Sequence, residues 1–205
     1  MLIKPDDLSV RQMYAYLVGM ITPRPIAWVS TVAPTGVTNL APFSFFNGVS
    51  AKPAALCFSA VNNRDGSPKD TIRNIEATGQ FVVNVVPAAM VEIMNQTSFE
   101  YPSEQSEIDA TGIEVLPSQL VRPPRVAASP IQIECQLIQV VKIGEGPAAG
   151  NLVVGQILIA HIDDAVLNAA GEIDPALVDT VGRMGASDYC WTRQRFALPR
   201  PVGSL

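Results

Sequence analysis

Prolines are spread along the whole chain and leave little room for long helices. The sequence has 17 prolines in 205 residues, and because proline breaks the interior of a helix, they divide the chain into short elements. Residues 131–137 alternate strictly between apolar and polar side chains, which is the pattern of a half-buried antiparallel strand. After a turn-rich loop at 144–150, residues 152–162 predict the second strand of a long hairpin. These patterns favour a mainly β fold, an antiparallel barrel rather than a doubly wound parallel sheet.

A few helices are expected beside the strands. The clearest helix signal lies between Ser67, which can cap a helix, and Gly79, which can end one, with Pro68 at the first helical position. Apolar spacing also predicts helices at 8–20 and 88–96. Further strands are expected at 25–32, 55–61 and 80–86.

Composition limits the class of protein. Hydrophobic residues make up 48% and charged residues 16% of the chain, a balance that builds a core, and the length fits one domain over residues 1–205. The net charge of −5 has the wrong sign for a protein that neutralises nucleic-acid phosphates. No apolar run reaches the roughly 18 residues of a membrane span, and no signal peptide is visible. We therefore expect a cytoplasmic protein that binds neither nucleic acid nor membrane.

Most side-chain chemistry of enzymes is missing. The three cysteines are far apart, and His161 is the one histidine of the chain, so no metal site is expected, and a histidine base would have to be His161. The glycine-rich stretch at 144–150 joins two strands, whereas a dinucleotide-binding loop opens a helix. If the protein is an enzyme, a bound organic cofactor would have to carry the chemistry.

The segment 36–50 interleaves small polar residues with aromatic ones. Such a segment can offer N–H groups and hydroxyls to an anion and aromatic faces to a flat ring. The alternative is an ordinary strand that buries Phe43, Phe45 and Phe46.

Four stretches carry a family resemblance. They read P-R-P-I-A-W-V-S-T at 23–31, G-V-T-N-L-A-P-F-S-F-F-N-G-V-S at 36–50, S-P-K-D-T at 67–71 and G-R-M-G-A-S-D-Y at 182–189. Together, and in this order, they resemble the flavin reductase-like family, FMN-binding split-barrel proteins that include flavoredoxins. The resemblance spans residues 8–200. It implies a Greek-key split β-barrel that forms a homodimer and holds one FMN per subunit near the dimer interface.

The resemblance also implies a set of cofactor-binding residues. Ser30 and Thr31 match a strand beneath the flavin, and a second group matches the positions along the ring and ribityl chain. A third group matches the phosphate side of the cofactor. This assignment has independent physical support, because the first turn of a helix attracts phosphate. For Arg64 and Lys69 the alternative is ordinary surface charge. The second group is Asn39, Leu40, Ala41, Ser44, Phe45 and Asn47, and the third is Ser59, Arg64, Lys69, Asp70 and Thr71.

Four further residues have roles that the sequence leaves open. Arg24, between two prolines, either pins a turn or reaches across the dimer. His161 matches a position near the flavin or nicotinamide in some relatives, or is structural. Arg183 and Tyr189 match a segment on the substrate side of the flavin.

The expected function is hydride transfer from NADH or NADPH to flavin, which requires stacking and orientation more than acid–base side chains. The small-molecule partners would be a flavin and a nicotinamide nucleotide, with a monooxygenase or an electron-transfer protein as a further partner. The first alternative is a flavoredoxin-type electron carrier that a protein partner reduces. The second is a barrel that binds a ligand without catalysis.

Overall fold

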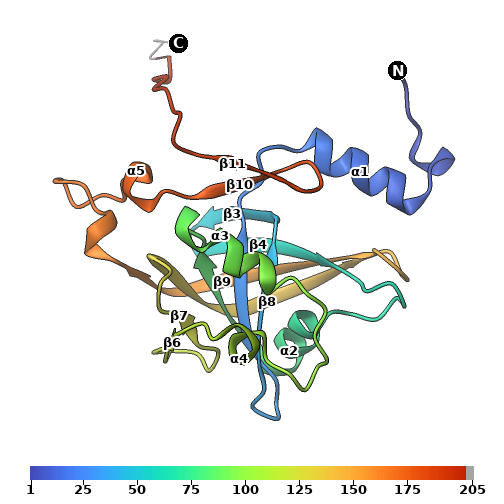
Figure 1. Ribbon diagram of the computed structural model, residues 1–205, viewed down its shortest axis with the longest axis horizontal. Helices are drawn as coiled ribbons and strands as arrows, with labels where there is room; N and C mark the ends of the chain where they lie inside the picture. Colours follow the sequence, from blue (N-terminus) through green and yellow to red (C-terminus); the bar gives the residue numbers. More distant parts are fainter. Residues whose placement is uncertain (202–205) are drawn as a thin grey trace.

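A computed structural model describes residues 1–201 and shows a curled antiparallel sheet of seven strands (Figure 1). The strands are β1 (Ala27–Val32), β2 (Thr38–Phe43), β3 (Phe45–Ala51), β4 (Ala54–Val61), β5 (Gln80–Val85), β8 (Ile131–Ile143) and β9 (Gly150–Ile162). They follow one another in the non-sequential order β2-β1-β5-β8-β9-β4-β3. The expected antiparallel split barrel, rather than a parallel sheet, is therefore confirmed.

The two edge strands of this sheet are consecutive in the chain. β2 ends at Phe43 and β3 begins at Phe45, so Ser44 alone stands between them. Since one residue spans only about 3.5 Å, the two edges must approach each other at Ser44. The sheet consequently curls into a barrel with a seam at this residue.

Short helices and two small sheets surround the barrel. The helices are α1 (Val10–Met20), α2 (Asp70–Thr78), α3 (Val91–Gln96), α4 (Glu107–Thr111) and α5 (Pro175–Val178), with 3₁₀ turns at Pro5–Asp7, Ala88–Met90 and Asp164–Val166. The small sheets pair β6 (Val115–Leu116) with β7 (Arg125–Val126) and β10 (Val181–Met184) with β11 (Asp188–Trp191). Within residues 1–201, no helix has the length and apolar character needed to cross a membrane.

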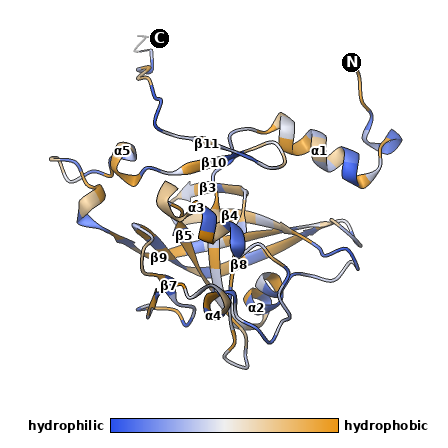
Figure 2. Cartoon of the chain, viewed as in Figure 1, coloured by the Kyte–Doolittle hydropathy of each residue, from blue (hydrophilic) through white to orange (hydrophobic). Residues whose placement is uncertain are grey.

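Helix α1 packs only lightly on the rest of the molecule. Figure 1 shows it above the barrel, and the colouring of Figure 2 shows hydrophobic residues in several of its turns. Val18 is its one buried residue, whereas Val10, Tyr14 and Met20 are exposed. The helix therefore leaves an apolar surface open.

The helix expected to start at Ser67 starts later. The Ser67 hydroxyl and amide both donate to the Asp65 carboxylate, at 2.6 and 2.8 Å, so Ser67 belongs to a tight turn. Helix α2 begins at Asp70, with Lys69 at the N-cap position, and Gly79 ends it in the left-handed conformation as expected.

Two apolar clusters share strand β1. Ala27 and Val29 face the barrel interior, where Phe58 and Phe81 lie, whereas Trp28 faces a second cluster outside the barrel. Both faces of β1 are thus buried, and the strand ties the two cores together.

In the alternating stretch of β8 the polar residues Gln132 and Glu134 are buried, whereas Gln136 is exposed, so the polar face is covered only at the start of the strand. Glu134 is fully buried because the loop before β7 folds over it and donates the amides of Gln119, Leu120 and Val121 to its carboxylate, at 2.8, 2.6 and 3.2 Å. His161 on β9 also binds this carboxylate, at 2.7 Å. Burial raises the pKa of Glu134, but these hydrogen bonds outweigh it and hold the pKa below its ordinary value.

Close packing in the barrel also leaves no room beside Gly155 on β9. A methyl group there would overlap Phe81 Cζ and lie 2.8 Å from Phe81 Cε1 and 3.5 Å from Cys135 Cβ. Cys135 is itself fully buried, and burial raises the pKa of its thiol to about 12.

We predict that Gly155→Ala lowers the free energy of unfolding by about 1–3 kcal/mol, because the added methyl overpacks the core. Urea denaturation measures the change. Gly19→Ala in α1 is the control, since nothing lies within 4 Å of a methyl at Gly19, and it should not destabilise. An equal free energy of unfolding for Gly155→Ala and the wild type would show that the Phe81 side chain can move aside without destabilising the fold.

A second prediction concerns acid stability. A carboxylate whose pKa is lower in the folded than in the unfolded protein stabilises the fold above the unfolded pKa, and this contribution is lost as the pH falls through the folded pKa. Glu134→Gln should therefore lower the free energy of unfolding at pH 7 and reduce its decline below the ordinary pKa of 4.5. Urea titrations at several pH values test this, with Glu145→Gln in the exposed β8–β9 loop as control. An unchanged pH slope in Glu134→Gln would contradict the assignment.

Candidate functional site

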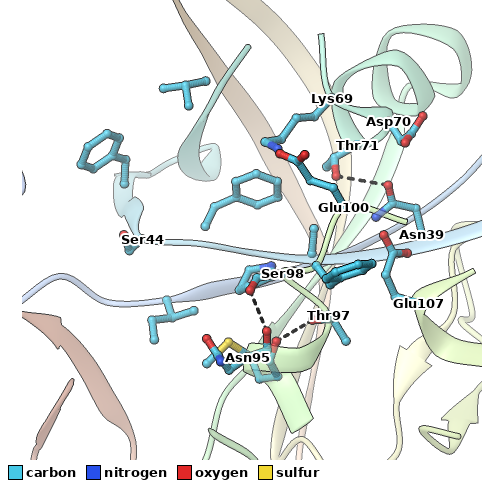
Figure 3. A pocket seen from close by; sticks show the side chains of 18 of the residues that line it. Asn39, Ser44, Lys69, Asp70, Thr71, Asn95, Thr97, Ser98, Glu100 and Glu107 are labelled. Atoms are coloured by element: carbon cyan, nitrogen blue, oxygen red, sulfur yellow. Dashed lines mark hydrogen bonds between the residues drawn. The ribbon is translucent and has the colours of Figure 1, made fainter. Parts of the chain in front are cut away.

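A pocket of about 630 Å³ opens beside the seam of the barrel. Its walls come from the junction of β2 and β3, the loop 63–65 with the start of α2, the segment 94–101, and the β10–β11 hairpin. Figure 3 shows Ser44 on one side of this pocket and Lys69 and Asp70 on the other. The pocket thus has two ends, here named the α2 end and the seam end.

At the α2 end, a helix begins next to a lysine. The first amides of a helix have no partner within the helix and carry its positive dipole end. Lys69 lies at the N-cap of α2, and its ammonium donates to Asn63 Oδ1 at 3.2 Å. Asp70 is paired with Arg73 on the helix. This end can therefore hold an anion.

Asn39 on β2 adds an unpaired donor at the same end. Its side-chain oxygen accepts the Thr71 hydroxyl at 3.5 Å, but its Nδ2 is buried and finds no hydrogen-bond partner in the part of the chain that the structure describes. Asn39 is only 7% exposed and lines the pocket. A buried amide nitrogen without a partner costs about 1–3 kcal/mol, so a ligand that accepts from Asn39 would remove that cost.

Glu107 faces the pocket close to Asn39. Burial raises the pKa of Glu107, although the hydrogen bond from the Leu40 amide, 2.9 Å long, opposes this effect. The same bond occupies the Leu40 N–H, and the Leu40 side chain is fully buried in the second core.

At the seam end, Arg24 holds three parts of the chain together. Its guanidinium donates to the carbonyls of Val18 and Ile21 at the end of α1, at 2.5 and 2.9 Å, and to the Gly185 carbonyl in the β10–β11 turn at 2.8 Å. It also donates to Ser44 Oγ at 3.2 Å. Arg24 therefore pins the turn that leads into β1, and does so at the pocket wall.

Arg183 on β10 lies beside Arg24. The two residues form an isolated antiparallel bridge, with backbone hydrogen bonds of 2.9 and 2.8 Å. The Arg183 guanidinium stacks 4.6 Å from the centre of the Tyr189 ring and donates to its hydroxyl at 2.6 Å. The Tyr189 hydroxyl in turn donates to Asn95 Oδ1 at 3.2 Å.

The segment after α3 forms one wall and was not anticipated from the sequence. Ser98, Phe99, Glu100 and Tyr101 line the pocket, and Phe99 packs edge-on against Tyr101 at 5.0 Å. No periodicity marks this segment, so its composition alone gives no signal. Tyr14, Asn63, Asp65, Asn95 and Glu107 also line the pocket without having been anticipated.

The structure brings most of the expected cofactor-binding residues together. Those that line the pocket are Asn39, Ala41, Ser44, Phe45, Ser59, Arg64, Lys69, Asp70 and Thr71.

The other expected residues lie elsewhere. Ser30 and Thr31 are fully buried in β1 and do not line the pocket; Thr31 lies opposite Asn39 of β2 and accepts from the Asn74 side chain at 3.0 Å. Asn47 is exposed on the edge strand β3, and His161 is bound to Glu134 outside the pocket.

The described residues offer binding groups rather than a catalytic pair. Within residues 1–201, no three His, Cys, Asp or Glu side chains gather in the way a metal site requires. The pocket instead combines aromatic faces with cations at both of its ends. Such a pocket suits an elongated ligand with a flat ring and a charged group.

Comparisons with known proteins agree with this architecture. The family model described as "Flavin reductase like domain" matches residues 20–192. An uncharacterized protein of Halalkalibacterium halodurans is 37% identical over 98% of this chain and 97% of its own.

Two solved structures are similar over nearly their whole length. Nitrilotriacetate monooxygenase component B from Bacillus cereus has a TM-score of 0.91 and 30% identity, over 97% of this chain and 98% of that one. The 2-nitrobenzoate 2-nitroreductase from Pseudomonas fluorescens has a TM-score of 0.87 and 29% identity, over 98% and 96%. The barrel with its seam, the pocket beside it and the family match lead to one conclusion: this chain belongs to the flavin reductase-like family.

Proposed function

We propose that the protein is an FMN-binding oxidoreductase that transfers hydride from NADH or NADPH to flavin, with residues 1–205 acting as one domain. The single observation that carries the proposal is the unpaired Asn39 Nδ2, buried in the pocket next to the N-terminus of α2 and Lys69. Within residues 1–201, this arrangement provides a donor without a partner and, in the same cavity, a helix N-terminus of the kind that attracts phosphate.

The residues present fit FMN. The FMN phosphate carries nearly two negative charges, which the α2 amides and Lys69 can neutralise. Asn39 Nδ2 would donate to an oxygen of the cofactor. Ala41, Ser44 and Phe45 would border the ring, and Ser30 and Thr31 would support that wall from the neighbouring strand β1.

When bound, FMN would supply the redox chemistry and accept hydride from the nicotinamide. The chain's own task is to hold two flat rings together and to keep water away, which lowers the barrier through orientation. The names of the two similar structures, a monooxygenase component and a nitroreductase, support a redox role and a monooxygenase as further partner.

The test starts with the visible spectrum of the purified protein during titration with FMN. We expect FMN to bind and its absorption to bleach when NADH or NADPH is added without oxygen. Bleaching with dithionite but with neither nucleotide would favour the flavoredoxin-type carrier. A protein that binds no FMN would contradict the proposal.

The same titration with Lys69→Gln tests the phosphate site. Losing one charge-assisted hydrogen bond should weaken FMN binding about tenfold. Lys142→Gln is the matched control, because Lys142 is exposed, pairs with Glu76 at 3.1 Å and lies outside the pocket. Equal FMN affinity in both variants would place the phosphate elsewhere.

We also propose that the protein forms a homodimer that covers α1. The support is that α1 exposes the apolar residues Val10, Tyr14 and Met20. One of them, Tyr14, also borders the pocket, so a partner covering α1 would lie next to the pocket. Light scattering should give twice the chain mass of 21.9 kDa. Met20→Asp should halve the mass, whereas the control Leu177→Asp in α5, on the opposite side in Figure 1, should not. A wild type with the mass of one chain would refute the dimer.

A further inference from the structure

We propose that Arg24 and Arg183, at the seam end of the pocket, form a subsite for an anionic group, a phosphate or a carboxylate, on the substrate that exchanges electrons with the cofactor. The inference rests on the proposed function, because the α2 end is assigned there to the cofactor phosphate. It adds the charge of the second substrate and the residues that select it.

The first support is the lack of a counter-charge. Arg24 is only 3% exposed, and all its hydrogen bonds go to carbonyl and hydroxyl oxygens. Within residues 1–201, neither Arg24 nor Arg183 forms an ion pair. Buried arginines are normally paired with an acid, because an isolated buried charge is costly.

The second support is the proximity of the two cations. Backbone hydrogen bonds hold Arg24 and Arg183 directly opposite each other, and both line the pocket. Burial lowers the pKa of Arg24; Tyr14 opposes this, and Arg183 lowers it further. An anion between the two guanidinium groups would relieve this repulsion.

The third support is the separation of charge along the pocket. Its acidic side chains belong to the other end: Figure 3 shows Asp70, Glu100 and Glu107 on the side of Lys69, away from Ser44, which Arg24 contacts. The seam end is therefore positive in a chain whose net charge is −5. Such a local field attracts anions and orients them as they enter.

The geometry of Arg183 suits this task. Its guanidinium is stacked on Tyr189 and donates to the Tyr189 hydroxyl and to the Ala186 carbonyl, and Tyr189 is held by Asn95, so the cation is positioned before a ligand arrives. A guanidinium binds phosphate and carboxylate through two parallel N–H bonds, which a lysine cannot reproduce. Tyr189 and Asn95 are thus positioning residues.

The experiment measures binding by calorimetry on the FMN-loaded protein and needs no turnover. The probes are NAD⁺, nicotinamide riboside, which lacks the phosphates, and benzoate as a simple carboxylate. Arg183→Gln should weaken binding of NAD⁺ or benzoate about tenfold, the loss of one charge-assisted contact. Binding of nicotinamide riboside should not change, and Arg183→Lys should recover part of the loss.

Arg193→Gln is the matched control. Arg193 is also stacked 4.6 Å from an aromatic ring, that of Trp191, and its loss changes the net charge equally, but it pairs with Asp179 outside the pocket. Arg24 is left intact, because its contacts hold α1 to the β10–β11 turn.

The outcomes separate the sources of the anion. A loss for NAD⁺ alone identifies a nucleotide phosphate, and a loss for benzoate alone identifies a carboxylate substrate. Unchanged binding of both, or an equal loss for nicotinamide riboside, would overturn the subsite. If the wild type binds no FMN, the proposed function fails, and the same titrations on the FMN-free protein then decide the subsite separately.

Discussion

The seam at Ser44 is the constraint on which the rest of the structure depends. Because a single residue links the two edge strands, the sheet has to curl, and its curvature creates both the barrel interior and the pocket beside the seam. Ser44 is itself a pocket residue and accepts from Arg24. Closure and ligand binding therefore depend on the same short stretch of chain.

The two ends of the pocket beside the seam differ in their charged groups. Among the described residues, the α2 end combines a cation with acids and an amide nitrogen that has no partner, whereas the two arginines of the seam end form no ion pair. One pocket therefore offers cationic groups at both of its ends, with aromatic side chains between them. A pocket of about 630 Å³ lies within the size range of cofactor sites.

The sequence predicts the elements better than it predicts their surroundings. Proline spacing and strand alternation favour the barrel, whereas Lys69 is singled out by the family resemblance, with independent support from the nearby helix start. The start of α2 is predicted too early, at Ser67, because the nearby Asp65 carboxylate accepts from both the hydroxyl and the amide of Ser67. The alternation of apolar and polar residues along β8 predicts an apolar and a polar face, but it cannot show that a loop covers Glu134 on the polar face. Glu107, at the start of α4, and Phe99, in an irregular segment, reach the pocket only because the tertiary fold brings them there, which no local pattern shows.

Because Cys135 is buried in the barrel, the rate at which thiol reagents label it depends on how often the barrel opens. Thiol reagents attack the thiolate, and with a pKa of about 12 and no exposure Cys135 presents almost none at neutral pH while β5, β8 and β9 stay packed around it. Labelling of Cys135 therefore has to wait until the strands separate. Cys57 and Cys190, which are only partly buried, have no such requirement. The slow labelling phase of the chain would thus record how often its barrel opens in the native state, without any added probe.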